Sequence, residues 1–263
     1  MNIFIRELKA NRKALIIWSI CMVLGVMSGM AKYTAYSSGG ASSQIFDKIP
    51  YSLKALIGMG SFDVTKISGF FAMLFLYIEL PAAIHAVLLG NGIIAKEERD
   101  KTTEFLMVKP VSRTVIITSK LLASLVNIVI INLVTLVSCI LMVGAYDNGE
   151  DITGEIMIFF LSLFIVQLIF LSLGALLSSL IKKSKASGSI ATGILFGSFI
   201  IAKITDLTDR VNIINVFSPF KYFSYADIVN GKGLSVFATV LSIILIAVFF
   251  ALTYFFYSKR DLT

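Results

Sequence analysis

The sequence predicts an all-α integral membrane protein with six transmembrane helices and both termini in the cytoplasm. Of its 263 residues, 57% are hydrophobic and only 15% are charged, which is more apolar surface than one soluble core of this length can bury. The apolar residues gather into six long runs, and a helix that crosses a bilayer needs about 20 of them. The third observation is the uneven distribution of lysine and arginine among the segments that join these runs.

The six predicted spans are mainly apolar stretches separated by polar segments. Their approximate bounds are 14–30, 69–94, 114–144, 155–181, 188–203 and 234–257. The second and third are longer than a bilayer requires, so we expect their helices to project beyond it. The whole chain, 1–263, is expected to form a single transmembrane domain.

The positive charges orient these spans. With the N-terminus inside, the inner segments carry fifteen lysines and arginines and the longer outer segments carry eight. Cytoplasmic loops of membrane proteins are rich in these residues, so both termini are predicted to be cytoplasmic. The net charge of +7 then reflects orientation in the membrane, and we expect no nucleic-acid partner. With one histidine in the chain, we expect no metal site.

Residues 1–13, which precede the first span, are basic. Phe4 and Leu8 lie on one side of a helix through them, and four cations recur at helical spacing on another side: Arg6, Lys9, Arg12 and Lys13. This pattern predicts an amphipathic interfacial helix on the inner membrane surface. A basic flank that only fixes the orientation of the first span is an equally good interpretation.

An ionisable residue, Glu79, stands in the middle of the second span, two residues before Pro81. A charge there is costly and usually indicates function. His85 follows six residues later, about 240° around the helix, so the two side chains do not share a face. Glu79 could line a translocation surface, or it could join helices through hydrogen bonds. Its candidate partners from other spans are Asn127, Asn132 and Gln167.

Between the fifth and sixth spans, a polar segment broken by proline and glycine is rich in aromatic residues. Such residues are typical of the belt where a membrane meets water. The alternative is an outer gate made of short re-entrant helices. The gate candidates are Phe217, Pro219, Phe220 and Tyr222.

The stretch EERDKTTEFLMVKPVSR, residues 97–113, is densely charged and lies between the second and third spans. Asp100, Thr102 and Thr103 can cap a short helix. Pro110 prevents that helix from continuing, and Ser112 can cap the next one. Phe105 and Leu106 would then be displayed among charges of both signs, which is typical of a docking surface. Alternatively, the two apolar side chains dip into the lipid interface.

This stretch resembles the signature of the type-2 (ABC-2) permease family of ATP-binding-cassette exporters, in which an acidic and basic cluster leads to a Thr-x-Glu-x-Leu core and then to Pro-Val-Ser-Arg. The matching positions are Glu97, Glu98, Thr102, Glu104, Leu106, Pro110, Val111, Ser112 and Arg113. Met107 stands where the family more often has a second leucine. The basic N-terminus and the segment FSPFKYFSYADIVNG agree with the family less sharply.

The resemblance implies a permease subunit in the bacterial cytoplasmic membrane, surrounded by membrane lipid. The stretch would be a coupling helix that docks on a separate ATPase subunit, present in two copies, with Arg99 and Phe105 among its contacts. ATP and Mg would bind that partner, because no phosphate loop of the form GxxxxGK[ST] occurs in the chain, and the chain itself would not be an enzyme.

A second permease copy is expected to complete the transporter, most simply as a homodimer. The translocation-path candidates are Glu79, Phe75 and Phe164, and the apolar spans favour a hydrophobic or amphipathic cargo, such as a peptide toxin, bacteriocin or drug. The alternative function is a secondary transporter or channel that uses Glu79.

Overall fold

The protein is a helical bundle throughout the part of the chain that the structure describes. The computed structural model describes residues 3–37, 50, 53–54, 57–59, 62–99, 111–146, 149–181, 183–207 and 209–259. Six of its helices are long and apolar enough to cross a membrane, which confirms the predicted all-α class and the six candidate spans. They are α1 (Ile3–Met30), α5 (Ile67–Arg99), α7 (Arg113–Tyr146), α8 (Thr153–Leu180), α9 (Ser184–Leu207) and α11 (Val236–Lys259).

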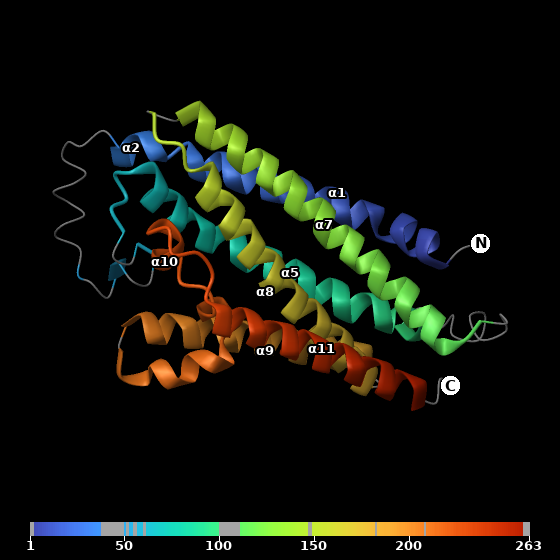
Figure 1. Cartoon of the computed structure of the whole chain (residues 1–263). Coiled ribbons are helices and arrows are strands. Elements are labelled where there is room, and N and C mark those ends of the chain that lie inside the picture. Colours follow the sequence, from blue (N-terminus) through green and yellow to red (C-terminus); the bar gives the residue numbers. More distant parts are fainter. Residues whose placement is uncertain are drawn as a thin grey trace.

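The long helices run along a common axis, so the bundle has two ends (Figure 1). At one of them, called here the terminal end, α1 begins, α5 ends, α7 begins and α11 ends (Figure 1). The opposite end, called the far end, carries the short elements. These are α2 (Tyr33–Ser37), the 3-10 helices η1 (Asp209–Phe217) and η2 (Pro219–Lys221), and α10 (Tyr225–Val229).

The first span and the basic residues before it form one helix rather than two. α1 runs without interruption from Ile3 to Met30, because the sequence contains neither proline nor glycine between residues 3 and 24 to stop it. Phe4 and Leu8, the apolar side of the predicted interfacial helix, are partly buried and pack against the apolar cluster that contains Ile93 and Ile117. This side of α1 therefore contacts other helices of the bundle.

Helices α5 and α8 approach each other closely at two glycines. A Cβ atom on Gly90 would overlap the backbone carbonyl of Leu171, and one on Gly174 would overlap that of Val87. Small residues let the backbones of membrane helices come into direct contact. These two helices therefore form the centre of the bundle, against which α9 and α11 pack.

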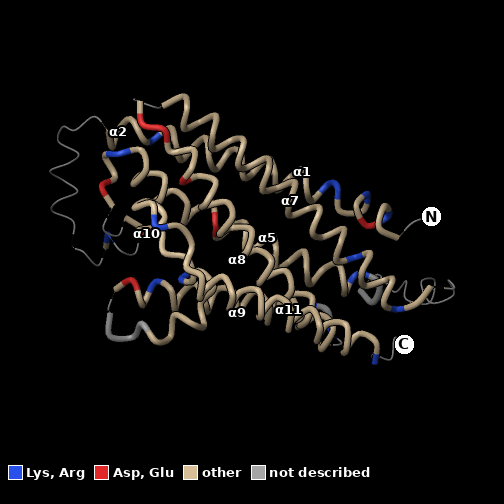
Figure 2. Tube along the Cα trace, in the orientation of Figure 1, with Lys and Arg blue, Asp and Glu red and all other residues tan. Residues whose placement is uncertain are grey.

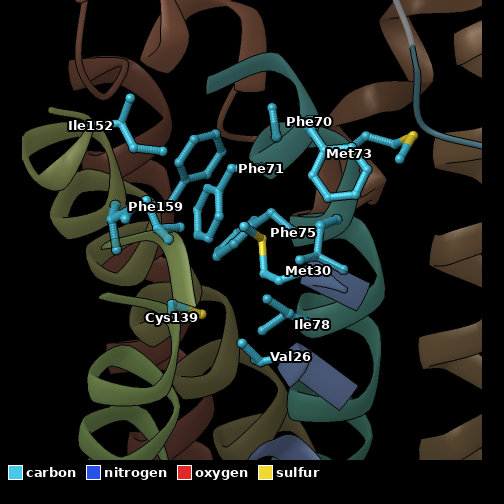
Figure 3. Close-up of a cluster of buried hydrophobic side chains, with 14 of the residues drawn as sticks. Val26, Met30, Phe70, Phe71, Met73, Phe75, Ile78, Cys139, Ile152 and Phe159 are labelled. Atoms are coloured by element: carbon cyan, nitrogen blue, oxygen red, sulfur yellow. The ribbon is translucent and has the colours of Figure 1, made fainter. Parts of the chain in front are cut away.

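The largest apolar core lies in the far half of the bundle. Figure 3 shows side chains of α1, α5, α7 and α8 meeting there, with Phe71, Phe75 and Phe159 at the centre. The rings of Phe75 and Phe159 lie 4.6 Å apart between centroids. Offset and edge-to-face contacts of this kind stabilise a core beyond the burial of area alone.

Polar side chains also join the helices within the bundle. The Asn132 side chain of α7 donates a hydrogen bond to Gln167 of α8, and the Gln167 amide in turn donates to the backbone carbonyl of Ala82 in α5 at 3.3 Å. Such bonds are the expected connection between membrane helices where no water is present. The charged residues, in contrast, concentrate near the two ends of the bundle (Figure 2).

Candidate functional site

The structure describes the predicted docking stretch, residues 97–113, only at its edges. The backbone of Glu97, Glu98 and Arg99 forms the last turn of α5, and Arg113 begins α7. Residues 100–110 lie outside the described residues; they include Thr102, Glu104, Phe105, Leu106 and Pro110. Both edges lie at the terminal end of the bundle (Figure 1).

The downstream edge of the stretch is attached to the last span. The Arg113 guanidinium donates a hydrogen bond of 2.9 Å to the backbone carbonyl of Ser258, close to the end of α11. Beside it, the Ser112 hydroxyl accepts a 3.4 Å bond from the Val115 amide, as expected of a residue that caps α7. A displacement of this edge would therefore be felt by both α7 and α11.

A buried carboxylate lies near the upstream edge. The Glu7 side chain of α1 has no solvent exposure and forms ion pairs with Arg6 at 2.9 Å and with Lys96 at 3.4 Å. Lys96 is one residue before the docking stretch. The ion pair between Glu7 and Lys96 thus connects α1 to the end of α5, where the docking stretch begins.

A third cation, Lys120, contributes from α7. The Lys120 side chain is fully buried, its ammonium donates a hydrogen bond to the backbone carbonyl of Ile93 in α5, and it attracts the Glu7 carboxylate. We call Arg6, Glu7, Lys96 and Lys120 the terminal network. Because a buried charge is tolerated only when it is paired and hydrogen-bonded, the network fixes α1, α5 and α7 relative to one another.

Sequence reasoning missed this network. Arg6 was assigned to a basic surface, whereas Glu7 and Lys120 were not singled out. Two signals were available in the sequence: Glu7 is the only acid in residues 1–13, and Lys120 is the only charged residue in 114–146. An isolated charge inside an apolar run calls for a partner of opposite sign.

Glu79 lies in the far half of the bundle and has a different kind of partner. Its side chain is 2% exposed and accepts a hydrogen bond from the Tyr225 hydroxyl of α10. The Tyr225 ring packs edge-on against Phe75 and Phe159, at 5.6 and 5.5 Å between centroids. Glu79 therefore joins α5 to a short far-end helix, and its bond is to Tyr225 rather than to Asn127, Asn132 or Gln167.

The other translocation-path candidates lie within the protein core of this chain. Phe75 is fully buried, and Phe164 is half-buried against the apolar cluster formed by α5, α8 and α9. His85 stacks edge-on against Trp18 of α1 at 5.3 Å between centroids. Its Nδ1 atom has no hydrogen-bond partner in the part of the chain described.

Three of the four outer-gate candidates are buried beneath the far end. Phe220 packs against Phe170 and Phe199, Pro219 is buried beside it, and the Tyr222 hydroxyl donates a 2.6 Å bond to the Val216 carbonyl. Burial raises the pKa of the Tyr222 hydroxyl. The fourth, Phe217, is 73% exposed. The three buried residues thus belong to a segment that packs over α8 and α9.

Six apolar helices, with α1 beginning and α11 ending at one end of the bundle, define a multi-pass membrane protein. The family model described as ABC-2 family transporter protein matches residues 1–262, so the chain belongs to the ABC-2 transporter family. A comparison with curated proteins finds no match. Permeases of this family are membrane components that are not themselves catalytic and generally pair with an ATPase subunit. Their usual location is the bacterial cytoplasmic membrane.

Proposed function

We propose that this chain is the permease subunit of an ATP-driven exporter, with the terminal end of the bundle facing the cytoplasm. The observation that carries the proposal is family membership over nearly the whole chain, together with six apolar helices whose charged stretch starts and ends at the terminal end. The excess of lysine and arginine in the segments at that end supports the orientation.

The orientation can be tested by labelling single cysteines in whole cells. Cys21 and Cys139 are the only cysteines, so a Cys21→Ser, Cys139→Ser chain supplies the background. In it, Lys32→Cys reports the far end and Ser258→Cys the terminal end. A maleimide that cannot cross the membrane should label the first variant in intact cells and the second only after lysis. The reverse pattern would overturn the orientation.

The docking stretch, residues 97–113, is the proposed contact with the ATPase. ATP and Mg would bind on two copies of that partner, and closure of the two copies would push on the stretch. The support from the structure is its mounting: the terminal network holds α5 at one edge, and Arg113 holds α11 at the other. A rigid mounting at both edges suits a segment that receives force.

The proposed cargo is hydrophobic or amphipathic, such as a peptide toxin, a bacteriocin or a drug, and a second identical permease would complete the path. The support is the many large apolar side chains that the long helices expose and the scarcity of charged residues between the two ends of the bundle (Figure 2). A bare ion would need polar or charged groups along its route. If the path lies between two copies, Glu79, Phe75 and Phe164 would lie behind its walls. They would then act by holding the helices that form the walls in place.

The coupling proposal is tested by affinity purification from gently solubilised native membranes. The tagged chain should recover a soluble ATPase, and a Phe105→Asp, Leu106→Asp chain should be inserted in the membrane but lose most of that ATPase. Phe217→Asp is the matched control, because it places the same charge on an exposed phenylalanine at the far end. Equal recovery with all three chains would exclude the docking role.

A further inference from the structure

The contact between α1 and α5 is incomplete in the far half of the bundle, where it leaves a cavity of about 520 Å³. Volumes of this size are typical of sites for small molecules. The cavity belongs to neither the docking stretch nor the Glu79–Tyr225 pair. It lies between two helices that are long and apolar enough to span the membrane, so the surrounding medium is lipid.

The lining of the cavity changes character along its length. From Trp18 and Pro81 in the middle of the bundle toward the far end, the walls are mainly aliphatic, with Met22, Val26 and Leu74 among them. The polar groups Lys32, Tyr36 and Tyr77 gather where the cavity reaches the far end. An apolar body with one polar end matches a molecule with a hydrocarbon chain and a polar head group.

Lys32 supplies a positive charge at that end. It follows α1 directly, its side chain is exposed, and its ammonium makes no ion pair or hydrogen bond with any residue that the structure describes. A lysine at a membrane boundary attracts anionic lipid head groups. The charge therefore favours a head group that carries a phosphate.

The length of the cavity matches one leaflet. Trp18 and Gly29, the first and last lining residues of α1, are eleven residues apart, which corresponds to about 17 Å of helix. The hydrocarbon core of a bilayer is about 30 Å thick, so one leaflet contributes about 15 Å. An acyl chain whose head group lies at Lys32 and whose end reaches Trp18 would thus cross one leaflet.

A single hydrocarbon chain is a narrower occupant than a helix of a second copy, which measures about 10 Å across with its side chains. Gly25 leaves the wall of the cavity open, since a Cβ atom there would meet nothing within 4 Å.

We propose that this cavity is a binding site for a membrane phospholipid with an anionic head group, whose acyl chain lies between α1 and α5 and whose phosphate is held by Lys32. The site lies in the leaflet at the far end. The proposal does not depend on the ATPase or on the cargo, so it can fail or succeed independently of the proposed function.

Trp18 offers a direct test, because it is the only tryptophan of the chain and lines the inner end of the cavity. Trp18 fluorescence is measured for the purified full-length protein in mixed micelles. The micelles contain either phosphatidylglycerol or phosphatidylcholine, and each lipid is brominated near the end of its acyl chains. Bromine quenches tryptophan on contact. We expect the quenching to saturate. Half-maximal quenching by phosphatidylglycerol should require about one fifth of the mole fraction that phosphatidylcholine requires, because one nearby cation favours the anionic lipid by this factor.

Two variants separate the contribution of the lipid head group from that of the acyl chain. Lys32→Glu should abolish the preference for phosphatidylglycerol while leaving Trp18 accessible. Gly25→Leu should fill the cavity and weaken quenching by both lipids several-fold. Gly193→Leu is the matched control, since this glycine of α9 also has open space around it and lies outside the cavity; it should behave as the unmodified chain.

Three results would overturn the proposal. The first is equal quenching by the two lipids in the unmodified chain. The second is quenching that Gly25→Leu leaves unchanged, which would mean that bromine reaches Trp18 from the outside of the bundle. The third is quenching that is present in a monomer and lost in a dimer, which would assign the cavity to side chains of a second copy.

Discussion

Glu7 and Glu79 are both buried carboxyl groups in long apolar helices, but the protein treats them differently. Glu7, at the terminal end, lies among three cations from α1, α5 and α7. Glu79, in the far half, accepts a hydrogen bond from the neutral Tyr225 hydroxyl. The first site is built from charges and the second from a hydroxyl and aromatic rings.

The position along the bundle explains the difference. Charged groups concentrate near the two ends, where head groups and water are close (Figure 2), and the desolvation of an ion pair is least costly there. Deeper in the hydrocarbon an unpaired charge is expensive, so a neutral donor suits a carboxyl group better. The comparison predicts that removing the Glu7 carboxylate is more damaging than altering Glu79 or its partner Tyr225.

The largest effect is expected from Glu7→Ala. It removes the buried carboxylate that pairs with Lys96 and attracts Lys120, and removing one partner of a buried ion pair destabilises a protein by about 3–5 kcal/mol. Thermal unfolding in detergent, followed by size-exclusion chromatography, measures the loss. Asp227→Ala, which breaks the exposed pair with Lys232, is the control and should lower stability by less than about 1 kcal/mol.

Tyr225→Phe should have an intermediate effect. It removes the donor to Glu79 but keeps the ring packing on Phe75, so a buried acceptor is left unsatisfied at a cost of about 1–3 kcal/mol. The same unfolding measurement applies. Tyr254→Phe removes an exposed tyrosine hydroxyl that bonds Thr118 at 2.8 Å and should change stability less. Equal losses for the two variants would contradict the importance of burial at Tyr225.

Glu79→Gln should cost below about 1 kcal/mol, because an amide oxygen of the same shape can still accept the Tyr225 bond. It also separates the exporter from the alternative of a secondary transporter or channel. ATP-driven transport should survive the substitution, whereas transport driven by a proton or ion gradient through Glu79 would be abolished. A complete loss of transport with normal stability would favour that alternative.

The smallest effect is expected from Arg6→Met. Its side chain is 33% exposed, and partly exposed ion pairs contribute about 0.2–1 kcal/mol. Glu7 keeps Lys96 and Lys120 in this variant. If Arg6→Met proved as damaging as Glu7→Ala, the stability of the terminal network would depend on its surface rather than on its buried carboxylate.

The sequence predicted the helical class and the number of spans, since apolar runs of bilayer length are a local property. It also predicted the cap at Ser112. It did not predict that α1 continues through the basic residues, because the amphipathic pattern of residues 1–13 does not reveal whether its apolar side faces lipid or helix. The pairing of Glu7 with Lys96 and of Glu79 with Tyr225 joins residues 89 and 146 positions apart, and such contacts depend on packing that no local pattern encodes.

The glycine contact between α5 and α8 has a mechanical consequence. Because Gly90 and Gly174 bring the two backbones together without side chains between them, neither helix can slide or rotate against the other without a steric clash. The pair therefore behaves as a stiff lever that runs from the docking stretch to the aromatic core in Figure 3. A push at one tip would therefore move the other tip as a whole.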